Sequence, residues 1–156
     1  MTIKVGILDC GNSNILSVKR AVQYISNAQC VSCKTPDDIS SVDKLIIPGV
    51  GAFPDGMKRI KANNLTEAIR EANSSGKEML GICLGMQLLA DFGFEFSKCA
   101  GLKIIPGKVV KIDDQGLRQQ RLTVPFVGWA KIDTSNSKCK ILDSQFHNQA
   151  FYFVHS

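Results

Sequence analysis

The sequence predicts an α/β protein with a doubly wound, mainly parallel sheet, flanking helices and a β-rich carboxyl-terminal part. Three observations support this class. Short apolar runs alternate with helical patterns in the first half of the chain. Loops rich in Gly, Asn and Pro follow these runs, at the edge where the ligands of parallel sheets bind. From Gly101 onward, short β-type runs replace the helical patterns.

Local signals justify each element in turn. The apolar run at 3–8 predicts a first strand, and the next helix is predicted by residues that share one face: Ile15, Val18, Ala21, Val22 and Ile25. Further strands are expected at 30–35, 44–47 and 78–83, with a turn and possible helix start at PDDIS. The helical pattern at 55–72 breaks near Asn63, where Thr66 is a candidate cap for a second segment. The runs IIPGKVVKI, RLTVPFVGWAKI and AFYFVHS predict later strands.

The composition is that of one globular domain covering residues 1–156. Hydrophobic residues make up 44% of the chain and charged residues 21%, so a sizeable core is expected. No run approaches the roughly 18 apolar residues of a membrane span, and the start MTIKVGILD lacks the order of a signal peptide. The net charge of +5 is scattered along the chain, which disfavours nucleic-acid binding. We therefore expect a cytoplasmic protein that binds neither nucleic acid nor membrane.

Six cysteines raise the possibility of a metal or redox site. Cys30 and Cys33 form the one close pair, and a zinc site would need a second pair or histidines at ligand spacing. On a strand, residues three apart point to opposite faces, so this pair is also unsuited to redox exchange. We expect no metal and no cofactor.

The segment Gly81-Ile82-Cys83-Leu84-Gly85 joins a predicted strand to a helical pattern. A sharp strand-to-helix turn leaves no room for side chains two residues before and after its centre, so glycine fits at both places and the central residue is exposed. Backbone N–H groups at the start of the helix would favour negative charge on the sulfur and could hold an oxyanion. The same pattern is also compatible with a buried structural cysteine at a tight turn.

A second glycine loop favours catalysis. The segment PGVGAF at 48–53 also ends a predicted strand, and its glycines would let a backbone N–H turn toward an acyl carbon attacked by Cys83. It is not a dinucleotide-binding fingerprint, because Pro54 stands where that motif needs glycine.

The motifs PGVGAF, LGICLGMQLL, GLKIIPGKV, VPFVGW and FYFVHS, in this order, resemble the class I glutamine amidotransferases, and among them the glutaminase subunits of imidazole glycerol phosphate synthase. The opening CGNSNILSV is similar to that family's first glycine turn, with Asn14 in place. The resemblance spans essentially the whole chain. It implies a flavodoxin-like fold and a (β/α)-barrel cyclase or synthase subunit as partner in a heterodimer.

The resemblance also implies a mechanism and the residues that perform it. Cys83 attacks the side-chain amide of glutamine, ammonia leaves, and water releases glutamate from the thioester. The N–H groups of Leu84 and of the Val50–Gly51 peptide form the oxyanion hole. Gly49 and Gln87 contact the substrate, while Asn14 and Trp129 belong to partner-facing loops.

The histidine and glutamate that activate the family's cysteine stand in an H-P-E motif, and these 156 residues contain no such motif. His155 matches a strand that precedes the catalytic histidine in the family. His147 lies in QFHNQ before that strand, so we expect an exposed loop histidine. The apolar ending AFYFVHS predicts that the sequence is a fragment of a longer chain, because a terminal strand of this kind would leave an exposed sheet edge.

Four alternatives remain open at this point. The family's VPHMGWN is VPFVGWA here, so Phe126 and Ala130 are compatible with a paralogue that supplies ammonia for amidation of a surface sugar. A truncated domain that docks on the synthase without catalysis is a second alternative. A cysteine hydrolase or a redox sensor built on the same sheet would be the others.

Overall fold

The computed structural model describes residues 2–11, 13–112, 124–135 and 141–156. These residues form two compact units, Met1–Val110 and Lys111–Ser156, which are described separately. A single domain over residues 1–156 therefore stays a prediction.

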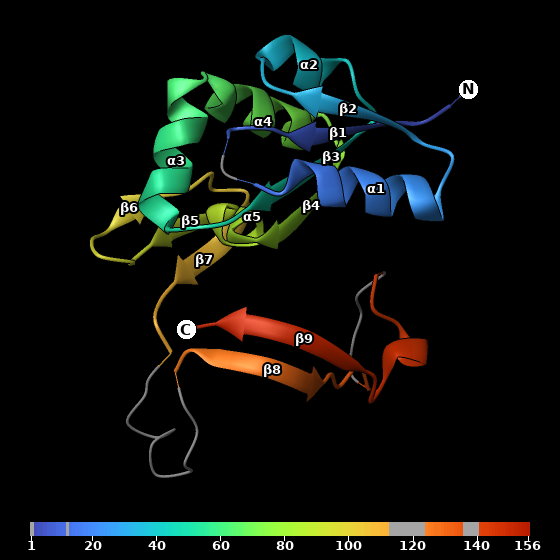
Figure 1. Ribbon diagram of the computed structural model, residues 1–156. Coiled ribbons are helices and arrows are strands. Elements are labelled where there is room, and N and C mark those ends of the chain that lie inside the picture. Colours follow the sequence, from blue (N-terminus) through green and yellow to red (C-terminus); the bar gives the residue numbers. More distant parts are fainter. Residues whose placement is uncertain (1, 12, 113–123, 136–140) are drawn as a thin grey trace. The chain divides into compact units, whose positions relative to one another are not determined.

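The first unit is built on a parallel sheet with strand order β2-β1-β3-β4 (Figure 1). The strands are β1 (Lys4–Leu8), β2 (Gln29–Cys33), β3 (Lys44–Gly49) and β4 (Glu78–Cys83). The chain runs from β1 to β2 in one direction and then returns past β1 to β3. Because such crossovers are right-handed, the reversal places α1 on one face and the later helices on the other. The predicted doubly wound, mainly parallel sheet is confirmed.

Five helices connect or follow these strands: α1 (Ile15–Ile25), α2 (Pro36–Ser40), α3 (Phe53–Ala62), α4 (Leu65–Ser74) and α5 (Leu84–Leu88). The predicted break near Asn63 is confirmed, but the predicted cap is wrong. Asn64 precedes α4 in the left-handed conformation, with φ of 57°, and Thr66 lies inside the helix. The turn is made by the backbone of Asn64, a role that asparagine tolerates better than most residues.

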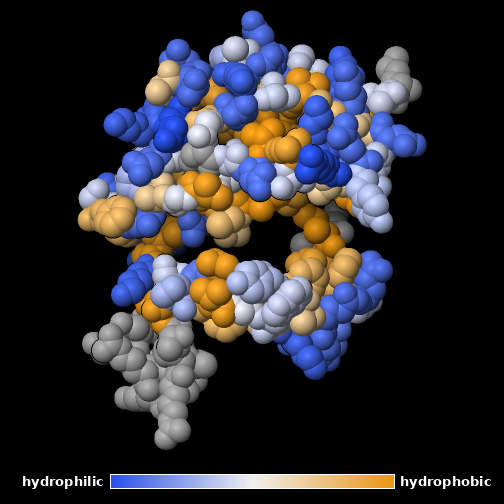
Figure 2. Space-filling view, in the orientation of Figure 1, coloured by the Kyte–Doolittle hydropathy of each residue, from blue (hydrophilic) through white to orange (hydrophobic). Residues whose placement is uncertain are grey.

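One continuous core fills the face of the sheet that α2, α3, α4 and α5 cover. Its largest fully buried members include Leu45 and Ile47 from the sheet and Phe53, Ile60 and Ile69 from the helices. Buried residues on adjacent positions of β1 and β3 lie outside this cluster, because side chains alternate between the faces of a strand: Val5, Ile7 and Ile46. The surface over α2 is mainly hydrophilic (Figure 2). The sheet is packed on this core, and it holds the loops at its carboxyl edge in position.

The chain continues from α5 into a small sheet with order β6-β5-β7, formed by β5 (Ala90–Gly93), β6 (Cys99–Ala100) and β7 (Ile105–Val109). The second unit contains the antiparallel pair β8 (Phe126–Lys131) and β9 (Ala150–His155), with a 3-10 turn η1 (Ser144–Phe146) between them in sequence. This confirms the predicted β-rich carboxyl-terminal part. Among the described residues, no helix is long and apolar enough to cross a membrane.

Candidate active site

Cys83 stands at a strained strand-to-helix turn. It is the last residue of β4 and directly precedes α5, and its backbone has φ of 53° and ψ of −120°. A residue other than glycine rarely adopts a positive φ, and strained turns of this kind concentrate at functional sites. The conformation is that of a nucleophile elbow, and the side chain of Cys83 is exposed as predicted.

The two glycines that flank Cys83 are both required by close packing, for different reasons. A Cβ added at Gly81 would lie 2.5 Å from the Cα of Met86, within the turn itself. A Cβ at Gly85 would lie 1.7 Å from the carbonyl oxygen of Ile47, on the neighbouring strand β3. The elbow therefore needs glycine after the cysteine because α5 lies directly against the sheet.

Strand register brings the PGVGAF loop to Cys83. Gly49, the last residue of β3, is paired with Cys83 in the parallel sheet. A Cβ at Gly49 would lie 3.0 Å from the backbone nitrogen of Gly85 and 3.1 Å from Cβ of Leu84. The loop that begins at Gly49 therefore lies against the first turn of α5.

The middle of this loop is well suited to a change of backbone conformation. Gly51 has φ of 97°, and apart from Gly51 and its two chain neighbours no residue has an atom within 4 Å of the position that its Cβ would occupy. Val50 is exposed, whereas Pro48 and Gly49, at the end of β3, line a cavity of about 10 Å³. The middle of the loop is therefore exposed and uncrowded at Gly51.

The other predicted site residues occupy defined positions. Leu84 is buried, and its N–H belongs to the first turn of α5, where backbone donors have no partner within the helix. Gln87 is half-buried on the same helix. Asn14 caps α1, its Oδ1 accepting a hydrogen bond from Ser17 N at 3.2 Å. The first unit thus gathers Cys83, Leu84 and the PGVGAF loop at the carboxyl edge of adjacent strands.

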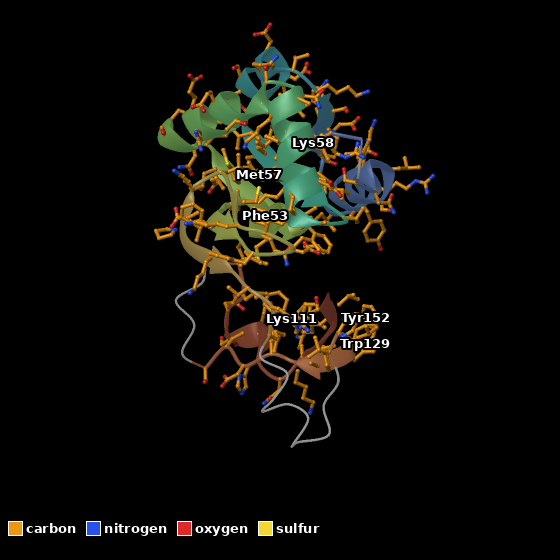
Figure 3. All side chains as sticks on the ribbon, turned by 90° about the vertical axis from the view of Figure 1, so that its left-hand side faces the viewer. Phe53, Met57, Lys58, Lys111, Trp129 and Tyr152 are labelled. Atoms are coloured by element: carbon orange, nitrogen blue, oxygen red, sulfur yellow. The ribbon has the colours of Figure 1, made fainter. Side chains whose placement is uncertain are left out.

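Trp129 lies in the second unit, on β8. Its indole is 72% exposed and meets the Tyr152 ring edge-on, with 5.7 Å between the ring centroids (Figure 3). Val127 and Val154 are exposed neighbours on the same pair of strands. Figure 2 shows orange and white areas, which mark apolar and near-neutral residues, on the surface of this hairpin.

Both histidines of the sequence belong to the second unit. His147 follows η1 and its side chain is 40% exposed, which confirms the prediction of an exposed loop histidine. Its Nδ1 lies 3.3 Å from both the Thr134 backbone nitrogen and Asp133 Oδ1. His155 ends β9 in register with Phe126.

The environment of two other cysteines distinguishes them from Cys83. Burial raises the pKa of the Cys33 thiol to about 11, and nearby Asp38 acts in the same direction. Burial and then Asp9 likewise raise the pKa of Cys10 to about 11. Because the thiolate is the nucleophile, both are poor candidates for chemistry near neutral pH.

A hollow elsewhere in the first unit is a separate feature. It has a volume of about 550 Å³, and its walls come from α2, α4 and the residues just before β4. There the Lys77 ammonium donates to the carbonyl oxygens of Ile39 and Ser40. Because it adjoins the start of β4, it lies at the opposite end of that strand from Cys83, and none of the predicted site residues lines it.

One residue near the loop was missed from the sequence. Glu95 Oε2 accepts a hydrogen bond of 2.8 Å from the backbone nitrogen of Phe53, the first residue of α3. The available signal was indirect: Ala52 has no side-chain oxygen to cap the helix, so an acceptor from elsewhere was needed. Phe53 and Glu95 are 42 residues apart in the sequence, so no local pattern indicates that they form a hydrogen bond.

Comparison with known proteins agrees with this geometry. The model of the glutamine amidotransferase class-I family matches residues 6–148. "Imidazole glycerol phosphate synthase subunit HisH 1" of Legionella pneumophila (strain Lens) is 44% identical over 156 residues, or 97% of this chain and 73% of the relative. The HisH subunits of Lacticaseibacillus casei (strain BL23) and Bacillus licheniformis are 42% and 40% identical, covering 96% and 97% of this chain and 69% and 70% of their own. The chain therefore belongs to the class I glutamine amidotransferase family.

Proposed function

We propose that this chain is the glutaminase subunit of an imidazole glycerol phosphate synthase that works in the cytoplasm in histidine biosynthesis. The observation that carries the proposal is the elbow at Cys83, paired in register with the glycine loop that begins at Gly49. Relatives at 40% to 44% identity bear the name of that synthase's HisH subunit. The substrate is glutamine, and the products are glutamate and ammonia.

The reaction proceeds through a thioester on Cys83. Its sulfur attacks the side-chain amide carbon of glutamine, and the C–N bond breaks as the thiol proton passes to the leaving nitrogen, which departs as ammonia. Water then adds to the thioester carbon, releases glutamate and restores the thiol. The net reaction is glutamine plus water to glutamate plus ammonia.

Two backbone donors stabilise the negative charge that develops on the amide oxygen. One is the N–H of Leu84, at the start of α5, and the other belongs to the Val50–Gly51 peptide. The open surroundings of Gly51 and its positive φ suit a peptide that turns toward the oxygen when the site is activated. Gln87, four residues after the nucleophile on α5, and Gly49 hold the glutamine.

The partner in this proposal is a (β/α)-barrel synthase subunit that receives the ammonia in a heterodimer. Asn14 at the start of α1 and the exposed Trp129 on β8 face it. Partner contact that orders the Val50–Gly51 peptide would couple ammonia release to demand in the synthase.

A glutamine-analogue electrophile tests the nucleophile. The analogue should modify Cys83, and the Cys83→Ala variant should lose the modification, while the matched Cys99→Ala variant keeps it. Labelling that survives Cys83→Ala would contradict the proposal. Glutamate formation is then measured with the synthase subunit and its nucleotide ligand present. Tight binding of the synthase without glutamate formation would instead identify a docking subunit.

A further inference from the structure

We infer that Glu95 is a positioning residue, which sets the oxyanion loop at its working distance from Cys83 by holding the first residue of α3. This inference rests on the proposed function for its catalytic consequence, but the contact itself can be tested without any activity.

The loop is fixed at its upstream end by the elbow. Gly49 is paired with Cys83, and close approach to Leu84 and Gly85 leaves no space for a side chain at Gly49. Any movement of the loop at this end would require movement of the nucleophile's own turn.

The downstream end is fixed by the segment that follows α5. Phe53 begins α3 and is 1% exposed, and a Cβ added at Gly93 would lie 2.4 Å from Cγ of its ring. The Phe53 ring therefore lies directly on the backbone of the last residue of β5. In addition, the Phe53 N–H donates to the Glu95 carboxylate at 2.8 Å. Figure 3 shows Phe53 on α3, together with Met57 one turn later.

The backbone around Glu95 is itself anchored. Phe94 N donates to the Val109 carbonyl oxygen at 3.0 Å, which ties this loop to β7, and Ser97 N donates to the Glu95 carbonyl oxygen at 2.8 Å. The carboxylate is thus presented to Phe53 from a supported turn.

The cap that Glu95 supplies has no local substitute. The residue before α3 is Ala52, which makes no side-chain cap, and Pro54 at the next position has no N–H. A carboxylate at the amino end of a ten-residue helix also interacts favourably with the helix dipole.

One continuous segment, residues 83–95, therefore holds both ends of the loop. Its first residues hold Gly49, and its last residues hold Phe53. The intervening residues 50–52 can change conformation only between these two fixed points. Glu95 limits where the Val50–Gly51 peptide can lie when it turns toward the oxyanion.

Amide hydrogen exchange in the ligand-free protein tests the contact. In Glu95→Ala the Phe53 amide should exchange at least about tenfold faster, because its acceptor is lost, while the core amides of Ile47 and Ile69 keep their rates. Glu95→Gln keeps an oxygen acceptor and should restore protection. Glu71→Ala, which removes an exposed carboxylate from α4, is the matched control. It should leave the exchange rates of the Phe53, Ile47 and Ile69 amides unchanged. Unchanged Phe53 exchange in Glu95→Ala would overturn the inference.

Kinetics with the synthase subunit test the consequence. Glu95→Ala should lower kcat roughly tenfold to a hundredfold, less than the loss of an oxyanion donor itself, with little change in KM. Glu95→Gln should recover most of the loss. A raised KM with unchanged kcat would assign Glu95 to substrate binding and overturn the positioning role. Absence of glutaminase activity in the unmodified chain would refute the proposed function, while the exchange result would still decide the contact.

Discussion

At the scale of single residues, exposure and pKa predict which thiol reacts. Cys83 is exposed, whereas Cys33 is 0% exposed and its pKa, like that of Cys10, is raised to about 11. At pH 8 roughly one part in a thousand of Cys33 and Cys10 is thiolate, so a small alkylating reagent should modify Cys83 well before either. Raising the pH toward 11 should bring Cys10 into reaction, whereas Cys33 should stay protected by its burial while the fold is intact. Peptide mass spectrometry over time checks the order, and Cys33 reacting before Cys83 at pH 8 would contradict it.

Alanine substitutions at two glycines of the site should differ in their effects: one should mainly lower stability, and the other should mainly lower activity. Gly85→Ala places a methyl group against the Ile47 carbonyl oxygen, a backbone atom that cannot move aside, and should lower the free energy of unfolding by at least about 3 kcal/mol. Gly51→Ala meets no neighbouring atom and should cost only about 1 kcal/mol for its positive φ, while glutaminase activity falls sharply. Urea unfolding and activity measured on both variants check the contrast. Equal destabilisation by the two would show that crowding at Gly85 is relieved elsewhere.

At the scale of elements, sequence patterns located the strands of the first sheet because each is a compact apolar run. The segment after Cys83 was predicted less well. The helical pattern that follows the elbow does not indicate that α5 ends at Leu88 or that β5 begins at Ala90. Strand β5 exists because it pairs with β6 and β7 and because Asp91 Oδ2 accepts from Gly107 N at 2.9 Å. These partners lie later in the chain, so no local pattern could indicate them.

The cap of α2 predicts how stability depends on pH. The Asp38 carboxylate accepts from the backbone nitrogens of Lys34 and Thr35, both at 2.9 Å, while Thr35 Oγ1 accepts from Asp38 N. The Lys34 hydrogen bond is the largest cause that holds the pKa of Asp38 below its usual value. The native state therefore binds fewer protons in mild acid than the unfolded state. The stabilisation from Asp38 is present above the ordinary aspartate pKa and is lost as pH falls through the lowered native value.

In the Asp38→Asn variant, the free energy of unfolding should accordingly fall less steeply as the pH is lowered than it does in the unmodified chain. Asp37→Asn, at the neighbouring position of the same helix, is the control. Urea unfolding between pH 7 and pH 3 checks the slopes. If the free energy of unfolding falls with pH equally in the Asp38→Asn variant and the unmodified chain, the role of this cap is contradicted.

At the scale of the whole molecule, the order of the strands determines which contacts of the site can be predicted from the sequence. The alternation of runs predicted a doubly wound sheet, and glycines on both sides of Cys83 predicted the elbow. The contact between Gly49 and the elbow depends on β3 lying next to β4, and the hold of Glu95 on Phe53 depends on the turn after β5. No local sequence pattern indicates either of these two contacts. The division into two compact units was not predicted either, because no low-complexity linker separates them.

The hairpin of the second unit carries the last prediction, which concerns assembly. Trp129 and Tyr152 are 72% and 57% exposed, a large aromatic pair left on the surface of a two-stranded sheet. Exposed aromatic residues of this kind often dominate binding energy, so Trp129→Ala should weaken synthase binding by at least about tenfold, or about 1.4 kcal/mol. Ile141→Ala, which removes another exposed apolar side chain of the same unit, should leave affinity unchanged. Trp129 is the single tryptophan of the chain, so a 5-fluorotryptophan label should give one fluorine resonance that shifts on titration with the synthase subunit. A resonance that stays in place while the synthase binds would exclude Trp129 from the interface, because an indole buried by a partner must change its environment.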